Sequence, residues 1–541
     1  MARPSINVGW ILLFSVIYIV FVGNRFFWQK IADIVAWPSL SGLSVFLTFA
    51  VTMIAAFFLI LLPITQRYLF KSIVIILFFI VALVSWFMNE YGTIINRDII
   101  QSALETDSLE ARELLTTGFF LHLAMYWLLP SILILWSQPK YSRGLSFITR
   151  TSLMMVLTAS VAVLTIWIGY KDISVLGRNH SELKMFINPT YPIYATWEVI
   201  IDNAEAAPGK LIAIDKDAHS ERPVLLAANH KPRIVVLVLG ETARADHFQR
   251  NGYDRPTTPL MTQARVLNYT NVSSCGTATS VSVPCIFSHL GRESFNSSDA
   301  SRYENLLHLL RETGTEILWR ENNTGCKGVC DDFETDNFRF ANDKRFCDGE
   351  GCFDEILLDD LRSRLSSQTK DLFIVLHQAG SHGPAYYRRY PKSMEFFSPV
   401  CASESPQDCS QDQLINAYDN TIRYTDYFLS KLIGILDEVS DTKQTAMIYV
   451  SDHGESLGEN GIYLHGLPYT FAPEAQTHVP MLVWLSKSFI EAERIDYSCM
   501  ASGENQPLSH DNIFHLVLSL FDVKTTLHIA DASLIKNCSS T

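Results

Sequence analysis

An acid and a histidine directly follow one apolar segment of this sequence. The run Ala446-Met-Ile-Tyr-Val-Ser451 carries no charge and leads into Asp452-His453-Gly454-Glu455. Such a run predicts a buried strand, and open α/β sheets present their ligands beyond strand ends of this kind. Carboxylate oxygens and imidazole nitrogens both bind zinc, so the pair predicts a cation site. We expect Gly454 to let the backbone turn sharply away from the strand.

A second acid occupies a comparable place. The apolar run Ile234–Leu239 is followed by Gly240 and Glu241. If the two runs are neighbouring strands of one sheet, Glu241 and Asp452 could share one cation. The alternative interpretation is the start of a helix, where acidic residues and threonine are favoured in any protein.

Hydroxyl groups are concentrated between Cys275 and Cys285. A hydroxyl at a helix start beside a cation can lose its proton and act as a nucleophile. On chemistry alone the candidates are Thr277, Thr279, Ser280 and Ser282. The alternative is that these hydroxyls only cap backbone groups, which we expect for all but one of them.

Three further residues have side chains that suit a phosphate or metal site. His382 and His465 lie in glycine-flanked loops, His382 just after the apolar run Leu372–Leu376 and His465 soon after Asp452 and His453. Imidazoles in such loops serve as metal ligands or proton donors, although a single histidine is usually a packing or surface residue. Lys327 lies between Cys326 and Cys330 and could meet a phosphate, although a loop lysine normally contacts water.

Composition limits the class of protein. The chain has 541 residues, too many for one hydrophobic core, and at least two domains are expected. The formal net charge of −13 argues against nucleic acid as a partner.

The ten cysteines all lie beyond the hydrophobic N-terminal part. Their even number and close spacing suggest disulfides and an oxidising compartment. They lack the paired two-residue spacing of a zinc ribbon. The simplest connectivity joins neighbours, and the last two cysteines could form a fifth pair: Cys275–Cys285, Cys326–Cys330, Cys347–Cys352, Cys401–Cys409 and Cys499–Cys538.

Residues 1–170 contain five apolar runs, each near the ~20 residues that cross a bilayer. The predicted spans are Val8–Val22, Leu43–Leu62, Phe70–Met88, Gly118–Trp136 and Leu153–Tyr170. Short loops rich in Lys and Arg are typical of the cytoplasmic side, so the N-terminus and the loops after spans two and four are predicted there. Everything after Tyr170 then lies outside, where disulfides form.

The remaining chain divides into an outer loop, a connector and a second domain. The loop between spans three and four contains Ile99–Glu110, which predicts a short amphipathic helix, either on the surface or as a wall of a substrate site. Residues 171–230 are interpreted as a connector: Met185–Trp197 could lie along the membrane surface, and Asp202–Asn229 reads as a linker.

Residues 231–541 alternate short apolar runs with helical stretches, which predicts an α/β domain with a mostly parallel sheet. The predicted strands are Ile234–Leu239, Glu316–Arg320, Leu372–Leu376, Met447–Val450 and Pro480–Trp484, and a helix is predicted between Asp412 and Val439.

Taken together, these motifs make the sequence resemble the phosphoethanolamine transferases that modify lipid A, a family that includes the mobile colistin-resistance enzymes. The resemblance covers the five spans, the connector and the outer domain. It is carried by Gly240-Glu-Thr-Ala-Arg-Ala-Asp-His247, Ser274-Cys-Gly-Thr-Ala-Thr279, Val283-Pro-Cys285, His382-Gly-Pro-Ala-Tyr386, Asn416-Ala-Tyr-Asp-Asn420 and Ser451-Asp-His-Gly-Glu-Ser-Leu-Gly-Glu-Asn-Gly-Ile-Tyr-Leu-His-Gly466.

The resemblance implies an alkaline-phosphatase-like fold and a set of site residues. One zinc, with a second possible, would be held by Glu241, Thr279, Asp452 and His453, and Thr279 would be the nucleophile. His382 and His465 match positions that contact a second zinc or the substrate phosphate, where they could act as acids. Substrate contacts are implied for Lys327, Thr106 and Glu110, and Ser102 stands where relatives often have asparagine.

The implied activity is transfer of phosphoethanolamine from phosphatidylethanolamine to a phosphate of lipid A, through an adduct on threonine. Diacylglycerol would leave, and the modified lipid A would bind polymyxin less well. We expect a monomeric, multi-pass protein of the bacterial inner membrane with its catalytic domain in the periplasm.

The sequence bears on four other functions. A phosphoglycerol transferase also has five spans and a threonine nucleophile, but the run from Glu455 to His465 favours phosphoethanolamine. Transfer to a lipopolysaccharide core sugar would use a similar enzyme. A sulfatase would need a Cys-x-Pro-x-Arg-type run, which Cys285-Ile-Phe-Ser-His289 lacks, and a non-catalytic receptor would be expected to have lost zinc ligands.

Overall fold

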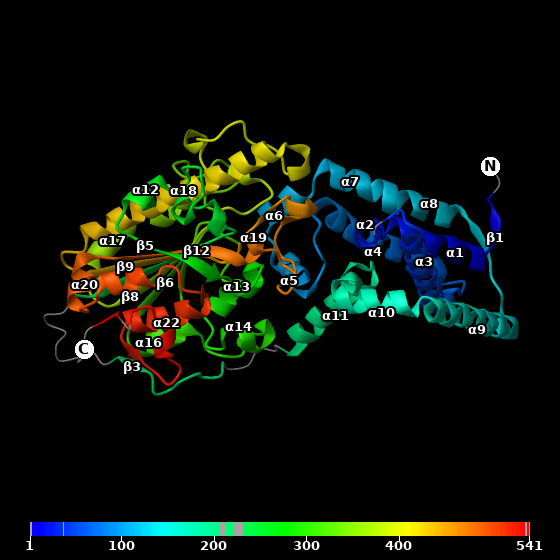
Figure 1. Cartoon of the computed structure of the whole chain (residues 1–541), viewed down its shortest axis with the longest axis horizontal. Coiled ribbons are helices and arrows are strands. Elements are labelled where there is room, and N and C mark those ends of the chain that lie inside the picture. The colour runs from blue at the N-terminus through cyan, green and yellow to red at the C-terminus, as the bar shows by residue number, and fades with distance from the viewer. Residues whose placement is uncertain (1–2, 36, 206–210, 221–230, 536–537, 540–541) are drawn as a thin grey trace. The chain divides into compact units, whose positions relative to one another are not determined.

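The computed structural model describes residues 3–35, 37–205, 211–220, 231–535 and 538–539. The chain forms two compact units, one of Met1–Arg97 with Leu115–Glu198 and one of Asp98–Leu114 with Val199–Thr541 (Figure 1). The outer loop between predicted spans three and four therefore belongs to the same unit as the α/β domain. The predicted domain boundaries at residues 170 and 230 stay a prediction.

The first unit is built of apolar helices. Within the described residues four helical segments are long and apolar enough to cross a membrane: Gly42–Ile64 from α3 (Leu40–Leu61), α4 (Phe70–Tyr91), Thr117–Trp136 and α9 (Gly144–Ile168). The first predicted span is one arm of a pair, Val8–Val22 and α2 (Arg25–Ile34), bent by 55°. The unit thus has four spans, or five if the bent pair crosses as one. The last span begins earlier than predicted, at Gly144, because the helix continues through a polar first part.

The segment Thr117–Trp136 contains a π-helical turn between α7 (Thr117–Leu123) and α8 (Leu129–Trp136). Pro130 has no N–H and cannot donate to the carbonyl of Tyr126 four residues earlier. The hydroxyl of Tyr18 donates to that carbonyl over 2.7 Å. This contact stabilises the packing of two helices because unpaired carbonyls are costly in a bilayer.

Three cationic stretches lie on one side of the first unit. β1 (Ser5–Asn7) pairs in parallel with β2 (Gln138–Lys140), which joins the N-terminus to the loop after the fourth predicted span. Lys71, in the first turn of α4 directly after the loop that follows the second predicted span, donates to the carbonyls of Leu135 and Ser137 over 3.0 and 2.7 Å. The predicted cytoplasmic loops therefore share one face.

The connector is mostly helical, with α10 (Tyr170–Asn179) and α11 (Thr190–Glu205). The first part of the connector belongs to the first unit, where the buried side chain of Asn188 donates to the carbonyls of Gly23 and Val81 over 3.1 and 2.9 Å. The predicted linker Asp202–Asn229 is wrong at 211–220, where β3 (His219–Ser220) pairs with β14 (Val523–Lys524). Its parts at 206–210 and 221–230 lie outside the described residues.

The α/β domain contains an eight-stranded sheet. In spatial order the strands are β13 (Leu508–Ser509), β5 (Leu267–Ser273), β12 (His478–Leu485), β9 (Gln444–Ser451), β4 (Arg233–Gly240), β8 (Leu372–His377), β6 (Glu316–Glu321) and β7 (Glu334–Asn337). All five predicted strands are present, and the sheet is mostly parallel, with β12 antiparallel to both neighbours. Strands β5, β7 and β13 were not predicted because their polar sequences give no apolar run.

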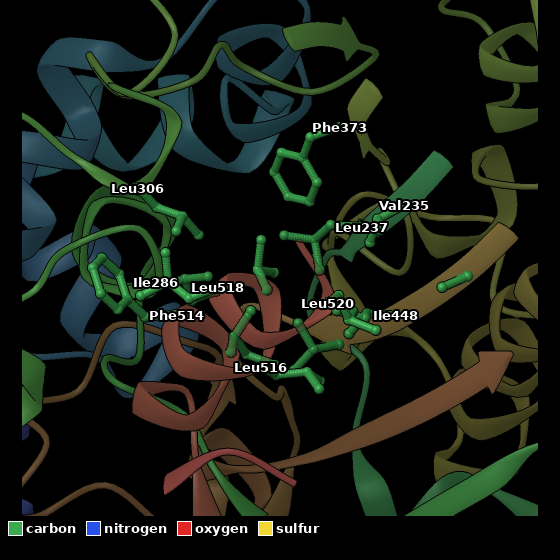
Figure 2. Packing of buried hydrophobic residues seen from close by; sticks show 14 of the residues in the cluster. Val235, Leu237, Ile286, Leu306, Phe373, Ile448, Phe514, Leu516, Leu518 and Leu520 are labelled. Atoms are coloured by element: carbon green, nitrogen blue, oxygen red, sulfur yellow. The ribbon is translucent and has the colours of Figure 1, made fainter. Parts of the chain in front are cut away.

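Helices cover both faces of the sheet (Figure 1). Alternate residues of β4 point to opposite faces, as in any strand. Val235 and Leu237 belong to one buried cluster with Ile286 of α13 (Thr279–Ile286) and with residues of α16 (Leu306–Glu312) and α22 (Asp511–Leu520); Figure 2 shows members of this cluster. Ile234 and Val236 face α17 (Leu361–Ser367) and α18 (Gln411–Glu438). Because β4 is buried along its whole length, it fixes the position of Glu241, the residue that follows it.

Five disulfides link the ten cysteines in the pairs predicted from spacing: Cys275–Cys285, Cys326–Cys330, Cys347–Cys352, Cys401–Cys409 and Cys499–Cys538. All belong to the second unit, which agrees with an oxidising compartment for that unit.

The predicted helix Ile99–Glu110 is two helices, α5 (Arg97–Glu105) and α6 (Ser108–Leu114). The break occurs because the side chain of Asp107 accepts hydrogen bonds from the backbone N–H groups of Leu109 and Glu110, at 2.8 and 2.9 Å. Asp107 thus starts a second helix in the way that acidic N-caps do.

Candidate metal centre and active site

Two acidic residues meet beyond neighbouring parallel strands. Gly240 at the end of β4 is the register partner of Ser451 at the end of β9, so Glu241 and Asp452 follow side by side. The side chains of both are buried. The backbone of Asp452 donates to the carbonyl of Gly240 over 3.0 Å, which locks the two strand ends together.

His453 completes a group of three possible ligands. One oxygen each of Glu241 and Asp452 and one nitrogen of His453 lie within 4.8 Å of one another. The Nδ1 of His453 lies 2.9 Å from the carbonyl of Gly454, so Nδ1 carries the proton and the Nε2 lone pair faces the carboxylates. Nε2 is 3.2 Å from Asp452 Oδ2 and 3.5 Å from Glu241 Oε1.

The donor set fits a bound cation. Asp452 Oδ2 is buried and has no hydrogen-bond partner among the described residues. Burial and the neighbouring Asp452 raise the pKa of Glu241 well above its usual value. A cation between these oxygens would satisfy the unpaired one and offset the repulsion. Two carboxylates and an imidazole are donors that zinc accepts.

Gly454 is required by a close approach rather than by its backbone dihedral angles. A Cβ at this position would lie 2.0 Å from the carbonyl oxygen of Ala475. The N–H of Gly454 donates to the carbonyl of Gln476 over 3.0 Å. The turn expected after the strand is therefore held against a neighbouring segment.

The structure distinguishes the four candidate hydroxyls. Thr279 begins α13, and its Oγ1 lies 3.2 Å from Glu241 Oε2 and 3.3 Å from His453 Nε2. Thr277 donates to the carbonyl of Leu467 over 2.6 Å, and Ser280 lies 3.0 Å from the Ser102 hydroxyl. Ser282 accepts from the N–H of Gly276 over 3.0 Å. Only Thr279 among the four contacts a possible ligand.

The two predicted histidines lie beside this group. The rings of His453 and His465 are 4.3 Å apart, and those of His382 and His465 are 5.4 Å apart. Glu455 Oε2 lies 2.7 Å from His465 Nδ1. Burial lowers the pKa of His465, but the charge and hydrogen bond of Glu455 outweigh burial and raise it above its usual value. Burial, then His465, lowers the pKa of His382 well below its usual value.

The predicted substrate contacts all lie in the same unit. Glu110 Oε1 of α6 is 3.4 Å from His382 Nε2, and burial raises the pKa of Glu110. Lys327 Nζ is 3.1 Å from Glu105 Oε2 of α5 and also donates to Thr324. The hydroxyl of Thr106 donates to the carbonyl of Ser102 within its own segment.

A chain of buried polar residues behind Glu241 was missed by the sequence analysis. Asn323 Nδ2 donates to Glu241 Oε2 over 2.6 Å. The backbone N–H of Asn323 donates to Glu321, and Glu321 Oε2 lies 2.9 Å from His377 Nδ1. Glu321 and His377 end strands β6 and β8 and are register partners. Their signal in the sequence is the same as that of Glu241, a polar residue at the end of an apolar run.

Asn323→Ala is expected to lower the affinity for zinc by about 10- to 100-fold, because it removes the bond that orients Glu241. Competition with a chromogenic chelator measures this affinity. Asn322→Ala is the matched control, since Asn322 bonds Asp354 and the carbonyl of Cys352 instead. The control is expected to lose stability but keep its zinc affinity. Equal affinities in both variants would contradict the role of Asn323.

Comparison with known proteins finds a matching family for each of the two parts of the chain. The family Phosphoethanolamine transferase EptA/EptB matches residues 53–204, and the family Sulfatase matches residues 233–523. The chain is 35% identical over 540 residues to phosphoethanolamine transferase EptA of Escherichia coli (strain K12), covering 99% of this chain and 98% of that protein. It is 36% identical over 533 residues to phosphatidylethanolamine transferase Mcr-1 of Escherichia coli, covering 96% of each.

A solved structure matches along the whole length. It is the integral membrane protein lipooligosaccharide phosphoethanolamine transferase A (EptA) from Neisseria meningitidis, with a TM-score of 0.94 and 31% identity, covering 99% of this chain and 100% of that one. The predicted resemblance, the helical membrane domain with an alkaline-phosphatase-like α/β domain, and the location are confirmed. The protein is a multi-pass protein of the inner membrane with its catalytic domain in the periplasm. By identity along nearly its entire length, the chain belongs to the EptA/EptB family of phosphoethanolamine transferases.

Proposed function

We propose that this enzyme transfers phosphoethanolamine from phosphatidylethanolamine to a phosphate of lipid A at a zinc site, through a covalent adduct on Thr279. The observation that carries the proposal is the position of Thr279 Oγ1, 3.2 Å from Glu241 and 3.3 Å from His453 at the start of a helix. The name of the relative Mcr-1 supports phosphatidylethanolamine as the donor.

Glu241, Asp452 and His453, with Thr279 as the fourth contact, would hold the zinc ion. When bound, zinc would lower the pKa of the Thr279 hydroxyl and offset the negative charge that grows on the phosphate oxygens. Phosphoryl transfer depends mainly on such positioning and charge neutralisation.

In the first step the Thr279 hydroxyl loses its proton to solvent, and Oγ1 attacks the phosphorus of phosphatidylethanolamine. The Oγ1–phosphorus bond forms as the bond from phosphorus to the glycerol oxygen breaks, and diacylglycerol leaves. Of His465 and His382, His465 is the better acid for the glycerol oxygen. Glu455 Oε2 lies 2.7 Å from its Nδ1 and stabilises the protonated ring.

In the second step an oxygen of a lipid A phosphate attacks the same phosphorus, and the bond to Thr279 breaks. The group transferred brings an ammonium to lipid A, which reduces the net negative charge that attracts a cationic antibiotic. Weaker polymyxin binding is the expected consequence.

Lys327 and Glu110 are proposed to hold the donor. The Lys327 ammonium suits the phosphate, and the buried Glu110 carboxylate suits the ethanolamine ammonium. In the structure Lys327 is paired with Glu105, so donor binding would exchange one anionic partner for another.

The test uses purified full-length protein with a fluorescent phosphatidylethanolamine, with and without lipid A. The expected products are fluorescent diacylglycerol and, with lipid A present, a gain of one phosphoethanolamine detected by mass spectrometry. Release of diacylglycerol from phosphatidylglycerol instead would favour a phosphoglycerol transferase. A mass gain confined to the core oligosaccharide of whole lipopolysaccharide would replace lipid A by a core sugar as acceptor.

A further inference from the structure

One arginine joins the two segments that face each other across the proposed donor site. Arg389 Nη2 donates to Glu113 Oε2 of α6 over 2.5 Å, and Arg389 Nε donates to the carbonyl of His382 over 2.7 Å. Both charged side chains are nearly enclosed, with 10% of Arg389 and 5% of Glu113 exposed. A guanidinium is a rigid planar fork, so these two bonds fix the backbone of His382 relative to α6.

The joined segments carry the groups that face the donor. Glu110 lies three residues before Glu113 on α6, which places both on one side of the helix. Glu110 Oε1 is 3.4 Å from His382 Nε2. Tyr386, between His382 and Arg389, donates to Glu455 Oε1 over 2.7 Å, and Glu455 holds His465.

The other end of α6 has its own attachment. Asp107, which caps α6, forms an ion pair with Arg339 at 2.6 Å, and both side chains are mostly buried. Because Asp107 fixes the start of α6 independently, loss of the Arg389 bonds would leave α6 attached at one end and free to pivot at the other.

We propose that Arg389 is a positioning residue of the transfer reaction: through Glu113 and the His382 carbonyl it sets the position of Glu110 beside His382, where the Glu110 carboxylate receives the ethanolamine ammonium of the donor. The inference rests on the proposed function. Its effect should fall on donor binding and not on the chemistry at Thr279, which contacts neither Arg389 nor Glu113 in the structure.

Arg389→Lys tests the proposal, because lysine keeps the charge but cannot donate in both directions at fixed angles. We expect KM for phosphatidylethanolamine to rise about 10- to 100-fold with kcat nearly unchanged, since a weakened bond between Glu110 and the ethanolamine ammonium is binding lost equally from the ground state and the transition state. Arg388→Lys is the matched control, since the neighbouring Arg388 bonds Tyr387 and Glu404 outside α6. The control should keep the KM of the unmodified enzyme.

Glu113→Gln and the double variant complete the experiment. If Arg389 acts through Glu113, the second substitution adds little to the first, which a double-mutant cycle reveals as a large coupling. Additive effects, an unchanged KM in Arg389→Lys, or a fall in kcat at constant KM would each overturn the inference. Should Arg389→Lys not fold, the KM of Glu113→Gln decides. Absence of transfer by the unmodified enzyme would instead overturn the proposed function.

Discussion

Thr279→Ala abolishes both transfer and the covalent adduct, with an expected fall in kcat of about 10⁴-fold or more, as for other enzymes that lose their nucleophile. The reason is geometric. Within the described residues Thr279 is the one hydroxyl of its segment within hydrogen-bonding distance of both Glu241 and His453. The other candidate hydroxyls are bonded elsewhere, so none can take its place without a backbone movement.

The adduct is measured by mass spectrometry of protein quenched after mixing with phosphatidylethanolamine alone. Thr279→Ser keeps a hydroxyl at the same place and should retain the adduct. Ser280→Ala removes the neighbouring hydroxyl, whose partner is Ser102, and should also retain it. A phosphoethanolamine adduct in Thr279→Ala would reject the assignment of the nucleophile.

Asp452→Asn is expected to have opposite effects on the metal-loaded and the metal-free protein. With zinc in solution, the variant should bind far less metal and lose transfer activity, because a carboxylate ligand is gone. Without zinc, the variant should be more stable than the unmodified protein by about 1–2 kcal/mol, a gain typical of relaxing a destabilised active site. The cause is that Glu241 and Asp452 are two buried carboxylates that repel each other when no cation separates them.

Zinc content by elemental mass spectrometry and thermal unfolding in detergent, each before and after a strong chelator, test both effects. Asp426→Asn is the control, since Asp426 is a buried carboxylate in α18 that accepts from the backbone of Leu260 and Met261. It should keep full zinc content. If Asp452→Asn retains its zinc, or if chelation leaves the unmodified enzyme active, the metal centre is wrong.

The sequence predicted strands, disulfide pairs and a helix correctly where a single local pattern was strong. The apolar runs of β4 and β9 are followed by Glu241 and Asp452. The bounds of β4 are nearly those predicted, whereas β9 begins three residues before the predicted strand, at Gln444. The disulfide pairs followed from short separations, since four of the five join cysteines no more than ten residues apart. The helix α18 was predicted because apolar residues recur at helical spacing between Asp412 and Val439.

The errors arose where a neighbouring segment decides the local structure. Strand β7 consists of Glu-Thr-Asp-Asn and is a strand because β6 pairs with it. Residues 211–220 were interpreted as part of a linker because charges are scattered along Asp202–Asn229, yet the side chain of Asp215 accepts hydrogen bonds from Thr525 and Thr526. The helix 99–110 is broken by the side chain of Asp107, which also pairs with Arg339 far along the chain.

The sequence alone determined which groups were available: acids at strand ends, a hydroxyl at a helix start, and histidines in glycine-flanked loops, because these depend on local pattern and residue type. Only the tertiary structure decided their partners. Strand order places Glu241 beside Asp452, and packing of α5 and α6 on the α/β domain brings Glu110 to His382 and Glu113 to Arg389. These contacts join residues more than 200 positions apart, and no local signal in the chain encodes such a distance.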